Sequence, residues 1–400
     1  MYDMLGGLTV IEASSFVASP TAGLYCAQFG AEVIRVDQIG GGPDYHRWPV
    51  TADNSSLYWE NLNRAKKSVA LDLSRPEGRE LLQELVAATG QFITNFPAEG
   101  FLSHAVLAKM RPDLVTVRVM GWPDGSPALD YTVNNAVGFP MLTGAGPEPV
   151  NHVLPAWDLL TGAYAAFALL AAIQRRSATG EGSEVRVPLS DVAIGTAANL
   201  GGVAEVLYSG ENRPRLGNAV YGLFGRDFVT ADGHRVMVVV VTHRQWAKLL
   251  AALSLEDNVA AIEAERGVSF AADDGLRFSH RDALYPLFEA EFARRRHAEL
   301  VATLDAAGIV HSSYRTMLDA AQDPAMVTEN PVFSQSADNP SGFTYPAAGA
   351  FGTIPQMERG EPLAAPRNGE HTEEVLTRHL NLSSGEIARL VDTGIAGICS

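Results

Sequence analysis

Cysteine is scarce in this chain of 400 residues, which contains only Cys26 and Cys399. Two cysteines cannot form a disulfide framework or a cysteine zinc site, so we expect a reducing compartment. Charged residues are also few, at 19% against 46% hydrophobic residues. This length and composition favour a large core divided between two folded domains, and they argue against disorder.

Segments that would direct the chain to a membrane are missing as well. The N-terminal region has no basic stretch followed by an apolar one, and no unbroken apolar run reaches the roughly 18–20 residues that span a bilayer. Basic residues number 30 against 46 acidic ones, which gives a formal net charge of −16. This charge repels a phosphate backbone. We therefore expect a cytoplasmic protein with no membrane partner and no nucleic-acid partner.

The motifs of common nucleotide, hydrolase and zinc chemistries are absent too. The sequence contains no G-x-x-x-x-G-K-[ST] loop, no G-x-S-x-G elbow and no H-E-x-x-H pair. Ser-Phe-Val-Ala-Ser-Pro at 15–20 follows the first predicted strand, where a dinucleotide fold needs G-x-G-x-x-G to approach a pyrophosphate. Asp37 is then explained as a strand-end residue that satisfies a turn. We expect no metal and no nicotinamide or flavin cofactor.

What the sequence does contain is an alternation of short β-branched runs and helical patterns over its first half. This alternation predicts an α/β fold. The expected strands are residues 8–13, 32–37, 91–95, 114–119 and 184–187.

Two helices are predicted from their ends and their apolar faces. Ser74 and Glu77 form a capping-box pattern ahead of an apolar face that begins at Leu81. Residues 158–176 are apolar nearly all round and predict a buried helix. An N-cap is the plain interpretation of Asp158 at its start, and a carboxylate kept ionised by the helix dipole is the alternative.

The character of the sequence changes after about residue 207, where a loop is followed by a predicted strand at 236–241 and several helical segments. Residues 323–366 are rich in Pro, Gly and Asn and lack periodicity, which is typical of a connection. We expect the first part of a large domain over 1–207 and a small domain over 208–322. Residues 323–400 should hold a return connection and the C-terminal part of the large domain.

Three basic residues and two loop histidines are candidate binding groups. Arg64, Lys66 and Lys67 form the only compact basic cluster, which suits a small phosphorylated ligand or a solvated surface. His46 and His152 lie in Gly- and Pro-containing loops, where function is common but a structural or solvated histidine is commoner. The residues alone leave these alternatives open.

Several short motifs, taken in their order, resemble the class III CoA-transferase family over nearly the whole chain. They are Phe-Val-Ala-Ser-Pro at 16–20, Gly-Ala-Glu-Val-Ile-Arg-Val-Asp at 30–37, Asn-Arg-Ala-Lys-Lys-Ser-Val-Ala-Leu-Asp-Leu at 63–73, Pro-Glu-Gly at 76–78, Thr-Asn-Phe at 94–96, Pro-Ala-Trp-Asp at 155–158, Arg-Leu-Gly-Asn at 215–218 and Gly-Glu-His-Thr at 369–372. The resemblance implies a Rossmann-like large domain, a smaller α+β domain and an interlocked homodimer.

The resemblance also implies a site and a substrate class. In the family, the aspartate that matches Asp158 accepts the acyl group of an acyl-CoA, and coenzyme A enters as part of the substrate, so no tightly bound cofactor is implied. The residues implied to line the CoA site are Phe16, Val17, Ala18, Leu71, Leu73, Ser74, Arg75, Asn95, Phe96 and Tyr131, with Arg64, Lys66 and Lys67 near its phosphates.

Residues 40–51, 130–134, 150–158 and 221–228 resemble one subgroup of the family, which moves CoA from C1 to C4 of a single C5 unsaturated dicarboxylate, mesaconate (2-methylfumarate). An Asp carboxylate with an ordinary pKa of about 3.9 is ionised at neutral pH and attacks a thioester without a general base. The implied reaction runs through an aspartyl anhydride and an aspartyl-CoA thioester. The substrate's free carboxylate needs a polar partner, and the candidates are His46, Arg47, His152 and Arg226.

Three alternatives accompany this interpretation. The first is an intermolecular CoA transferase, which needs a second acid as acceptor. The second is an α-methylacyl-CoA racemase, which uses a His–Asp pair. In the racemases the histidine precedes an aspartate in the segment that matches 129–131, and Leu129 occupies its place here, which argues against racemisation. The third is a catalytically silent CoA-binding protein, which the retained Asp158 motif disfavours.

Overall fold

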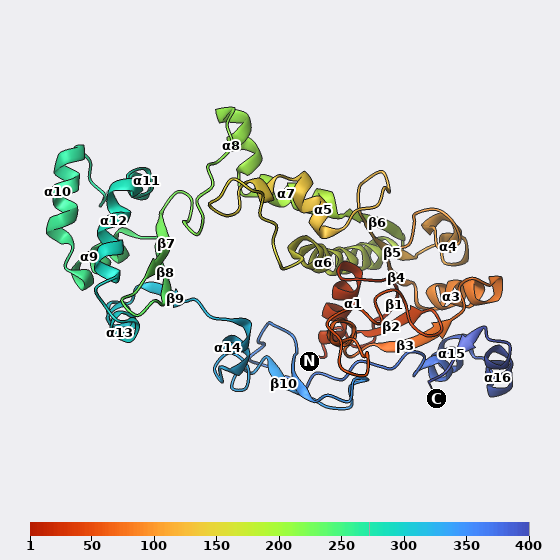
Figure 1. Ribbon diagram of the computed structural model, residues 1–400. Helices are drawn as coiled ribbons and strands as arrows, with labels where there is room; N and C mark the ends of the chain where they lie inside the picture. Colours follow the sequence, from red (N-terminus) through yellow and green to blue (C-terminus); the bar gives the residue numbers. More distant parts are fainter. Residues whose placement is uncertain (272, 400) are drawn as a thin grey trace. The chain divides into compact units, whose positions relative to one another are not determined.

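The structure is a computed structural model of the chain, and it describes residues 1–271 and 273–399. The chain forms two compact units. The large unit consists of Met1–Gly138, His152–Gly210 and Asp323–Ser400, and the small unit consists of Phe139–Asn151 and Glu211–Gln322. Figure 1 labels most of the helices and strands of both units.

The large unit contains nine described strands and ten described helices. Its strands are β1 (Thr9–Ala13), β2 (Glu32–Asp37), β3 (Lys67–Leu71), β4 (Gln91–Thr94), β5 (Val115–Met120), β6 (Ser183–Pro188), β10 (Phe333–Ser336), β11 (Tyr345–Ala348) and β12 (Ala396–Gly397). Its helices are α1 (Ala18–Gln28), α2 (Leu57–Asn63), α3 (Pro76–Thr89), α4 (His104–Met110), α5 (Asp130–Ala136), α6 (Ala156–Thr179), α7 (Leu189–Asn199), α8 (Gly202–Ser209), α15 (Thr372–Leu380) and α16 (Ser384–Asp392).

The central sheet of the large unit has the strand order β12-β3-β2-β1-β4-β5-β6. All neighbours pair in parallel except β12, which pairs antiparallel with β3. The chain order reverses between β1 and β4, so the loops after these two strands diverge and leave a crevice at the carboxyl edge, the usual ligand position in doubly wound sheets. The predicted α/β fold with a Rossmann-like sheet is confirmed.

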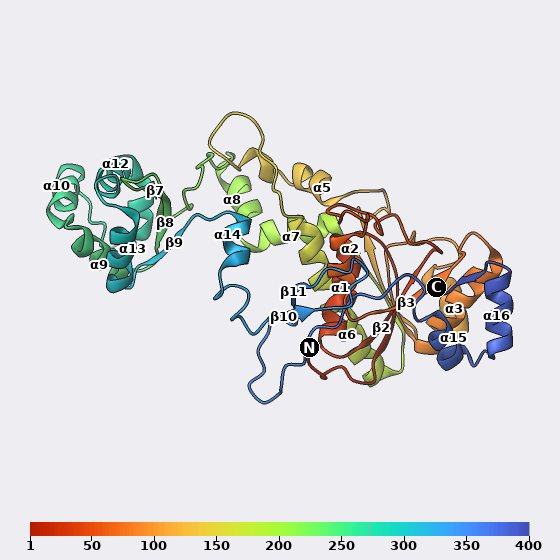
Figure 2. The same cartoon turned by 60° about the horizontal axis from the view of Figure 1, so that its bottom comes forward.

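Helices cover both faces of this sheet. On one face, α3 and α15 lie side by side (Figure 1 and Figure 2), and the core there joins residues of five strands to residues of α3, α4, α15 and α16. Ile11, Phe92, Leu82 and Val375 are fully or almost fully buried in it. On the other face, α1 packs against α6, which also contacts β5 and β6. The C-terminal helices α15 and α16 thus belong to the core of the large unit.

Helix α6 is the one described helix that is long and apolar enough to cross a membrane by length and composition. Its packing is that of a core helix, because Ala165 and Leu169 are fully buried and it contacts α1, β5 and β6. Gly162 lets α1 come close, since a Cβ at this position would lie 2.6 Å from the carbonyl oxygen of Ala18 and 2.6 Å from the Cβ of Thr21.

Two helix starts differ from the prediction. Helix α3 begins at Pro76 with Arg75 as its N-cap, and the Ser74 hydroxyl donates to Asp72 Oδ1 at 2.6 Å instead of capping the helix. Proline suits the first position of a helix, where no N–H is needed, so it sets the start. Helix α6 begins two residues before Asp158, with Pro155 as N-cap, which places Asp158 in the first turn.

The prediction also missed strands. The sequence pattern predicts no strand over residues 67–71, yet they form β3, which pairs with β2 and in which residues 68–71 are all buried. The connection after residue 323 contains the antiparallel pair β10 and β11. The strands β3, β10 and β11 have five residues or fewer each, so the pattern that would predict them is weak in the sequence.

The small unit is built on a three-stranded antiparallel sheet with the order β7-β8-β9. Its elements are η1 (Phe139–Met141), β7 (Phe224–Val229), β8 (Arg235–Val240), α9 (His243–Leu253), α10 (Glu256–Arg266), α11 (Asp274–Ser279), α12 (Arg281–Phe292), α13 (His297–Ala307), β9 (Val310–Ser313) and α14 (Met317–Gln322). Segment 139–151, expected in the first domain, belongs to this unit because Arg215 donates to the carbonyl oxygens of Met141 and Gly146.

Candidate active site

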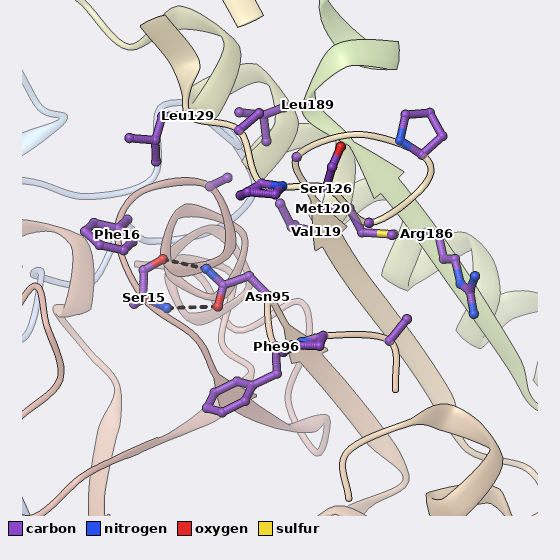
Figure 3. A pocket seen from close by; sticks show the side chains of 18 of the residues that line it. Ser15, Phe16, Asn95, Phe96, Val119, Met120, Ser126, Leu129, Arg186 and Leu189 are labelled. Carbon is purple, nitrogen blue, oxygen red and sulfur yellow. Dashed lines mark hydrogen bonds between the residues drawn. The ribbon is translucent and has the colours of Figure 1, made fainter. Parts of the chain in front are cut away.

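A cavity of about 700 Å³ lies at the carboxyl edge of the large unit's sheet, at the switch point between β1 and β4. Figure 3 shows side chains from the loops after β1, β4 and β5 around it. The cavity is lined by residues 15–18, 95–99, 119–121 and 123–129 and by Asp158, Arg186 and Leu189.

The loops after β1 and β4 are tied to each other at this cavity. The main-chain N–H of Ser15 donates to Asn95 Oδ1 at 3.2 Å, and Asn95 Nδ2 donates to the carbonyl oxygen of Ser15 at 3.0 Å (Figure 3). Phe16 follows with φ 69°, a left-handed conformation that a bulky residue adopts only when its surroundings hold it. The holding contact is a hydrogen bond of 2.9 Å from the Phe16 N–H to Asp44 Oδ2.

Asp44 is itself fixed by a buried ion cluster. Arg35 pairs with Glu12 at 3.2 Å, with Asp37 at 2.6 Å and with Asp44 at 3.3 Å. The predicted turn role of Asp37 is therefore replaced by an ion pair. Lys66 completes the cluster with a 2.8 Å contact to Glu12. A buried cation surrounded by three acids is costly to disturb, so the cluster holds the Phe16 loop rigidly.

The loop after β4 has a second anchor in Arg118, which is fully buried on β5. Its guanidinium donates to the carbonyl oxygens of Phe96 at 2.7 Å, Pro97 at 2.9 Å and Leu102 at 2.8 Å. It also pairs with Glu184 at 2.8 Å. Both loops that flank the switch point are thus positioned by buried arginines rather than by packing alone.

Asp158 enters the cavity from the first turn of α6. That turn is capped by another acid, because Oδ2 of Asp130 accepts the N–H of Trp157 at 2.7 Å and the N–H of Asp158 at 3.1 Å. The other Asp130 oxygen is bonded to Nε2 of His152. The N-cap interpretation of Asp158 is therefore wrong: the cap comes from Asp130, and the Asp158 carboxylate faces the cavity.

Burial raises the pKa of Asp158 to about 7, and the nearby charge of Asp130 adds to this effect. Arg47 acts in the opposite direction and lowers the pKa of Asp158 in part. The expectation of an ordinary carboxylate that is fully ionised at neutral pH needs correction, since the group titrates close to neutrality. A carboxylate with a strongly shifted pKa in a cleft is a common mark of a reactive group.

The structure brings six of the predicted site residues together at the cavity: Asp158, Phe16, Val17, Ala18, Asn95 and Phe96. Tyr131 lies outside the lining, and its hydroxyl donates to the carbonyl oxygen of Val153 at 3.3 Å. Its ring also contacts the ring of His152, with centroids 5.6 Å apart.

The segment after β3 does not line this cavity, since β2 and β1 separate β3 from the switch point. Leu71 is fully buried in the core, and Leu73 packs against that core. The Ser74 hydroxyl is engaged with Asp72, and Arg75 donates to the carbonyl oxygen of Thr393 at 2.8 Å.

The basic cluster predicted near the CoA phosphates is spread over three different environments. The ammonium of Lys66 is fully buried and donates to Glu12, Asn63 and the carbonyl oxygen of Pro20, so none of its three protons is left for a phosphate. Arg64 is buried and donates to the carbonyl oxygen of Ala348 at 2.8 Å. Lys67 pairs with Glu32 at 2.8 Å and with Glu374 at 2.5 Å.

The four candidates for the substrate carboxylate are not equivalent. Arg47 is exposed, stacks on the rings of Phe16 and Tyr58, and acts electrostatically on Asp158. His46 is bonded to the carbonyl oxygen of Asn54 at 3.1 Å. His152 is bonded to Asp130. Arg226 lies in the small unit and pairs with Glu289 there at 2.8 Å.

Sequence reasoning missed the third side of the cavity. The end of β5, most of the loop that follows it up to Leu129, and the half-exposed Arg186 of β6 line this side. The rule that ligands bind beyond the carboxyl ends of parallel strands could have pointed to the segment after β5. No group of three or more His, Cys, Asp or Glu side chains that could hold a metal occurs in the described ranges.

The sequence profile of CoA-transferase family III matches residues 5–372, and the chain belongs to this family. It is an enzyme of CoA transfer. It is 45% identical to the 2-methylfumaryl-CoA isomerase of Chloroflexus aurantiacus, over 99% of this chain and 98% of that protein. It is 27% identical to the succinate–glutarate CoA-transferase of Agrobacterium fabrum, over 93% and 94%.

The fold agrees with this assignment. A crystal structure of a CaiB/BaiF family protein from Brucella suis matches with a TM-score of 0.76 and 25% sequence identity, over 94% of this chain and 99% of that chain.

Replacing Asp158 by Asn should stabilise the protein above neutral pH. The unfolded carboxyl ionises near its ordinary pKa of 3.8, whereas the folded one stays neutral up to about 7, so the wild type loses stability as the pH rises between these values. We expect Asp158→Asn to gain roughly 1–3 kcal/mol of unfolding free energy at pH about 8, and little at pH about 4. Denaturant unfolding at both pH values measures this.

Asp124→Asn serves as a control from the same cavity. Hydrogen bonds from Ser126 lower the pKa of Asp124, so its ionised form is favoured in the folded state and the Asn variant should lose stability at high pH. A loss of stability in Asp158→Asn at high pH would contradict the raised pKa of Asp158.

Proposed function

We propose that this enzyme transfers CoA within one molecule, from the C1 to the C4 carboxylate of 2-methylfumarate (mesaconate), through covalent intermediates on Asp158. The position of the Asp158 carboxylate, at the cavity on the switch point of the sheet, carries the proposal. The relative called 2-methylfumaryl-CoA isomerase supports the choice of substrate, since the similarity extends over the whole of both chains.

The covalent chemistry needs no base beyond the carboxylate itself. An oxygen of ionised Asp158 attacks the thioester carbonyl carbon, the C–S bond breaks, and the electron pair leaves with the sulfur of CoA. The thiolate then attacks the aspartyl carbonyl carbon of the resulting anhydride. This step forms an aspartyl-CoA thioester and releases the substrate carboxylate.

The dicarboxylate turns end for end in the cavity and repeats the two steps in reverse with its other carboxylate. It must stay bound while it turns, and water must be kept from the anhydride. The lining suits this task, because Phe16, Phe96, Val119 and Leu189 are apolar and the two main loops are held by buried arginines.

The thioester end of CoA should lie along the loops that line the cavity, next to Phe16, Val17, Ala18, Asn95 and Phe96. Leu71, Leu73, Ser74, Arg75 and Tyr131 stay proposed contacts for more distant parts of CoA. The carboxyl end of β3 is on the same edge of the sheet as that of β1, so an extended ligand can reach from one to the other.

Arg47 is the proposed partner of the free carboxylate, because it acts electrostatically on Asp158, lies over the ring of the cavity residue Phe16 and has no acid partner among the described residues. Arg47→Met should raise the KM for the dicarboxylate thioester at least tenfold, as expected when a charge-assisted contact is lost. Arg47→Lys, which keeps the positive charge, should show a smaller rise in KM than Arg47→Met. Steady-state kinetics measures both, and an unchanged KM in Arg47→Met would exclude this role.

We also propose a cytoplasmic homodimer. The exposed surface of α6 carries Leu160, Tyr164 and Phe167, a set of large apolar side chains that a second copy would cover. The two free cysteines agree with a reducing compartment. Sedimentation velocity at micromolar concentration tests the dimer, and a monomer under these conditions would contradict it.

An intermolecular transferase is the second candidate, favoured by the similarity to a protein whose name specifies two acids, succinate and glutarate. Its site would need the same nucleophile and a second acid. A racemase is less well supported, since Leu129 lines the cavity where the racemases have a histidine.

The decisive assay offers purified enzyme mesaconyl-C1-CoA with no added acid. We expect the wild type to produce the C4 thioester, detected by chromatography and mass spectrometry, and Asp158→Ala to produce none. Conversion that begins only when a free acid is added would reject intramolecular transfer and leave the intermolecular reaction.

A further inference from the structure

Asp130 is a buried acid that lies directly beside the nucleophile. It is 1% exposed, and its carboxylate accepts the N–H groups of Trp157 and Asp158 through one oxygen while His152 holds the other. These contacts fix the carboxylate from two elements, so it cannot turn away from Asp158.

His152 is in turn held by aromatic neighbours. Its ring lies 5.6 Å from the ring of Tyr131 and 6.3 Å from the ring of Trp157, centroid to centroid. The indole N–H of Trp157 donates to Asn134 Oδ1 at 3.0 Å. The first turn of α6, helix α5 and the segment before α6 thus form one bonded unit around Asp130.

The electrostatic surroundings of Asp158 come from four elements. Asp130 faces it from α5, His152 precedes it before α6, Arg47 lies in the loop after β2, and Tyr58 lies on α2. Burial and the charge of Asp130 both disfavour an ionised Asp158, and Arg47 favours it. Either protonation or acylation of Asp158 removes its charge and so relieves the repulsion by Asp130.

We propose that Asp130 is a positioning residue with an electrostatic role: it fixes the first turn of α6, and its charge favours the acylated forms of Asp158 over the free carboxylate. The proposal rests on the function proposed above. When an Asp158 oxygen bonds to the thioester carbon, the C–S bond breaks and the negative charge leaves with the CoA sulfur, so Asp158 no longer carries a charge beside Asp130. His152 keeps Asp130 in place during this charge movement.

The test removes the charge of Asp130 and keeps its shape. In Asp130→Asn the amide oxygen can still accept the two N–H groups of α6, while the amide nitrogen faces His152, whose ring nitrogen can accept in the other tautomer. Asp191→Asn is the matched control, because Asp191 is also an acid in the first turn of a helix, α7, but is exposed and does not line the cavity.

Two readouts distinguish an electrostatic role of Asp130 from a purely structural one. They are the pH profile of kcat and the ratio of covalent to free enzyme in rapidly quenched samples with mesaconyl-C1-CoA. Asp130→Asn should move the acid limb of the profile down by about one pH unit and lower the covalent ratio about tenfold, the size of one pKa unit. Asp191→Asn should match the wild type in both.

An Asp130→Asn variant with the wild-type pH profile and covalent ratio would overturn the proposal while leaving the proposed function intact. A wild type that forms no covalent adduct would reject the proposal and the proposed function together.

If Asp130→Asn does not fold, two variants of His152 test the proposal instead. His152→Ala should lower kcat without lowering the midpoint of the acid limb, and His152→Gln, which can still donate to Asp130, should restore kcat. Equal kcat values in these two variants would overturn the proposal.

Discussion

The close packing of α1 on α6 is the constraint on which the site depends. Only glycine at position 162 allows this approach, because a Cβ would lie 2.6 Å from the carbonyl oxygen of Ala18. The segment that leads into α1 carries the cavity loop at Phe16, and the first turn of α6 carries Asp158. Their contact brings Asp158 to the switch point between β1 and β4, where a doubly wound sheet offers its ligand crevice.

The buried charges of the large unit fall into two kinds. Around Arg35, cations and acids compensate one another, and the result is a rigid support for the Phe16 loop. At the cavity, the two acids Asp158 and Asp130 lie close together, and the exposed Arg47 offsets the repulsion of an ionised Asp158 only in part. An uncompensated pair costs stability, so its presence in a cleft points to chemistry rather than to folding.

Much of this could be predicted from the sequence. The alternation of strands and helices indicated the α/β fold, and the motif around Asp158 pointed to a residue that does line the cavity. The basic residues misled, because Lys66 is next to Lys67 in sequence but fully buried on the other side of β3, bonded to Glu12. The capping of α6 by Asp130 could not be predicted from the sequence either, since it depends on a hydrogen bond from the N–H of Asp158, 28 residues further along the chain. Spacing shows which residues share an element, but it does not show which distant side chain caps it.

The central claim, that Asp158 forms the covalent intermediates, is tested most directly by following oxygen atoms. The substrate is prepared with heavy oxygen in its free carboxylate and is turned over by the enzyme. That carboxylate attacks the aspartyl-CoA thioester, and breakdown of the second anhydride at the substrate carbonyl leaves one of its oxygens on the aspartate. Fragment ions of the peptide that contains both Asp130 and Asp158 locate the label. The account predicts heavy oxygen at Asp158 and none at Asp130, and an unlabelled Asp158 in enzyme that has converted its substrate would contradict it.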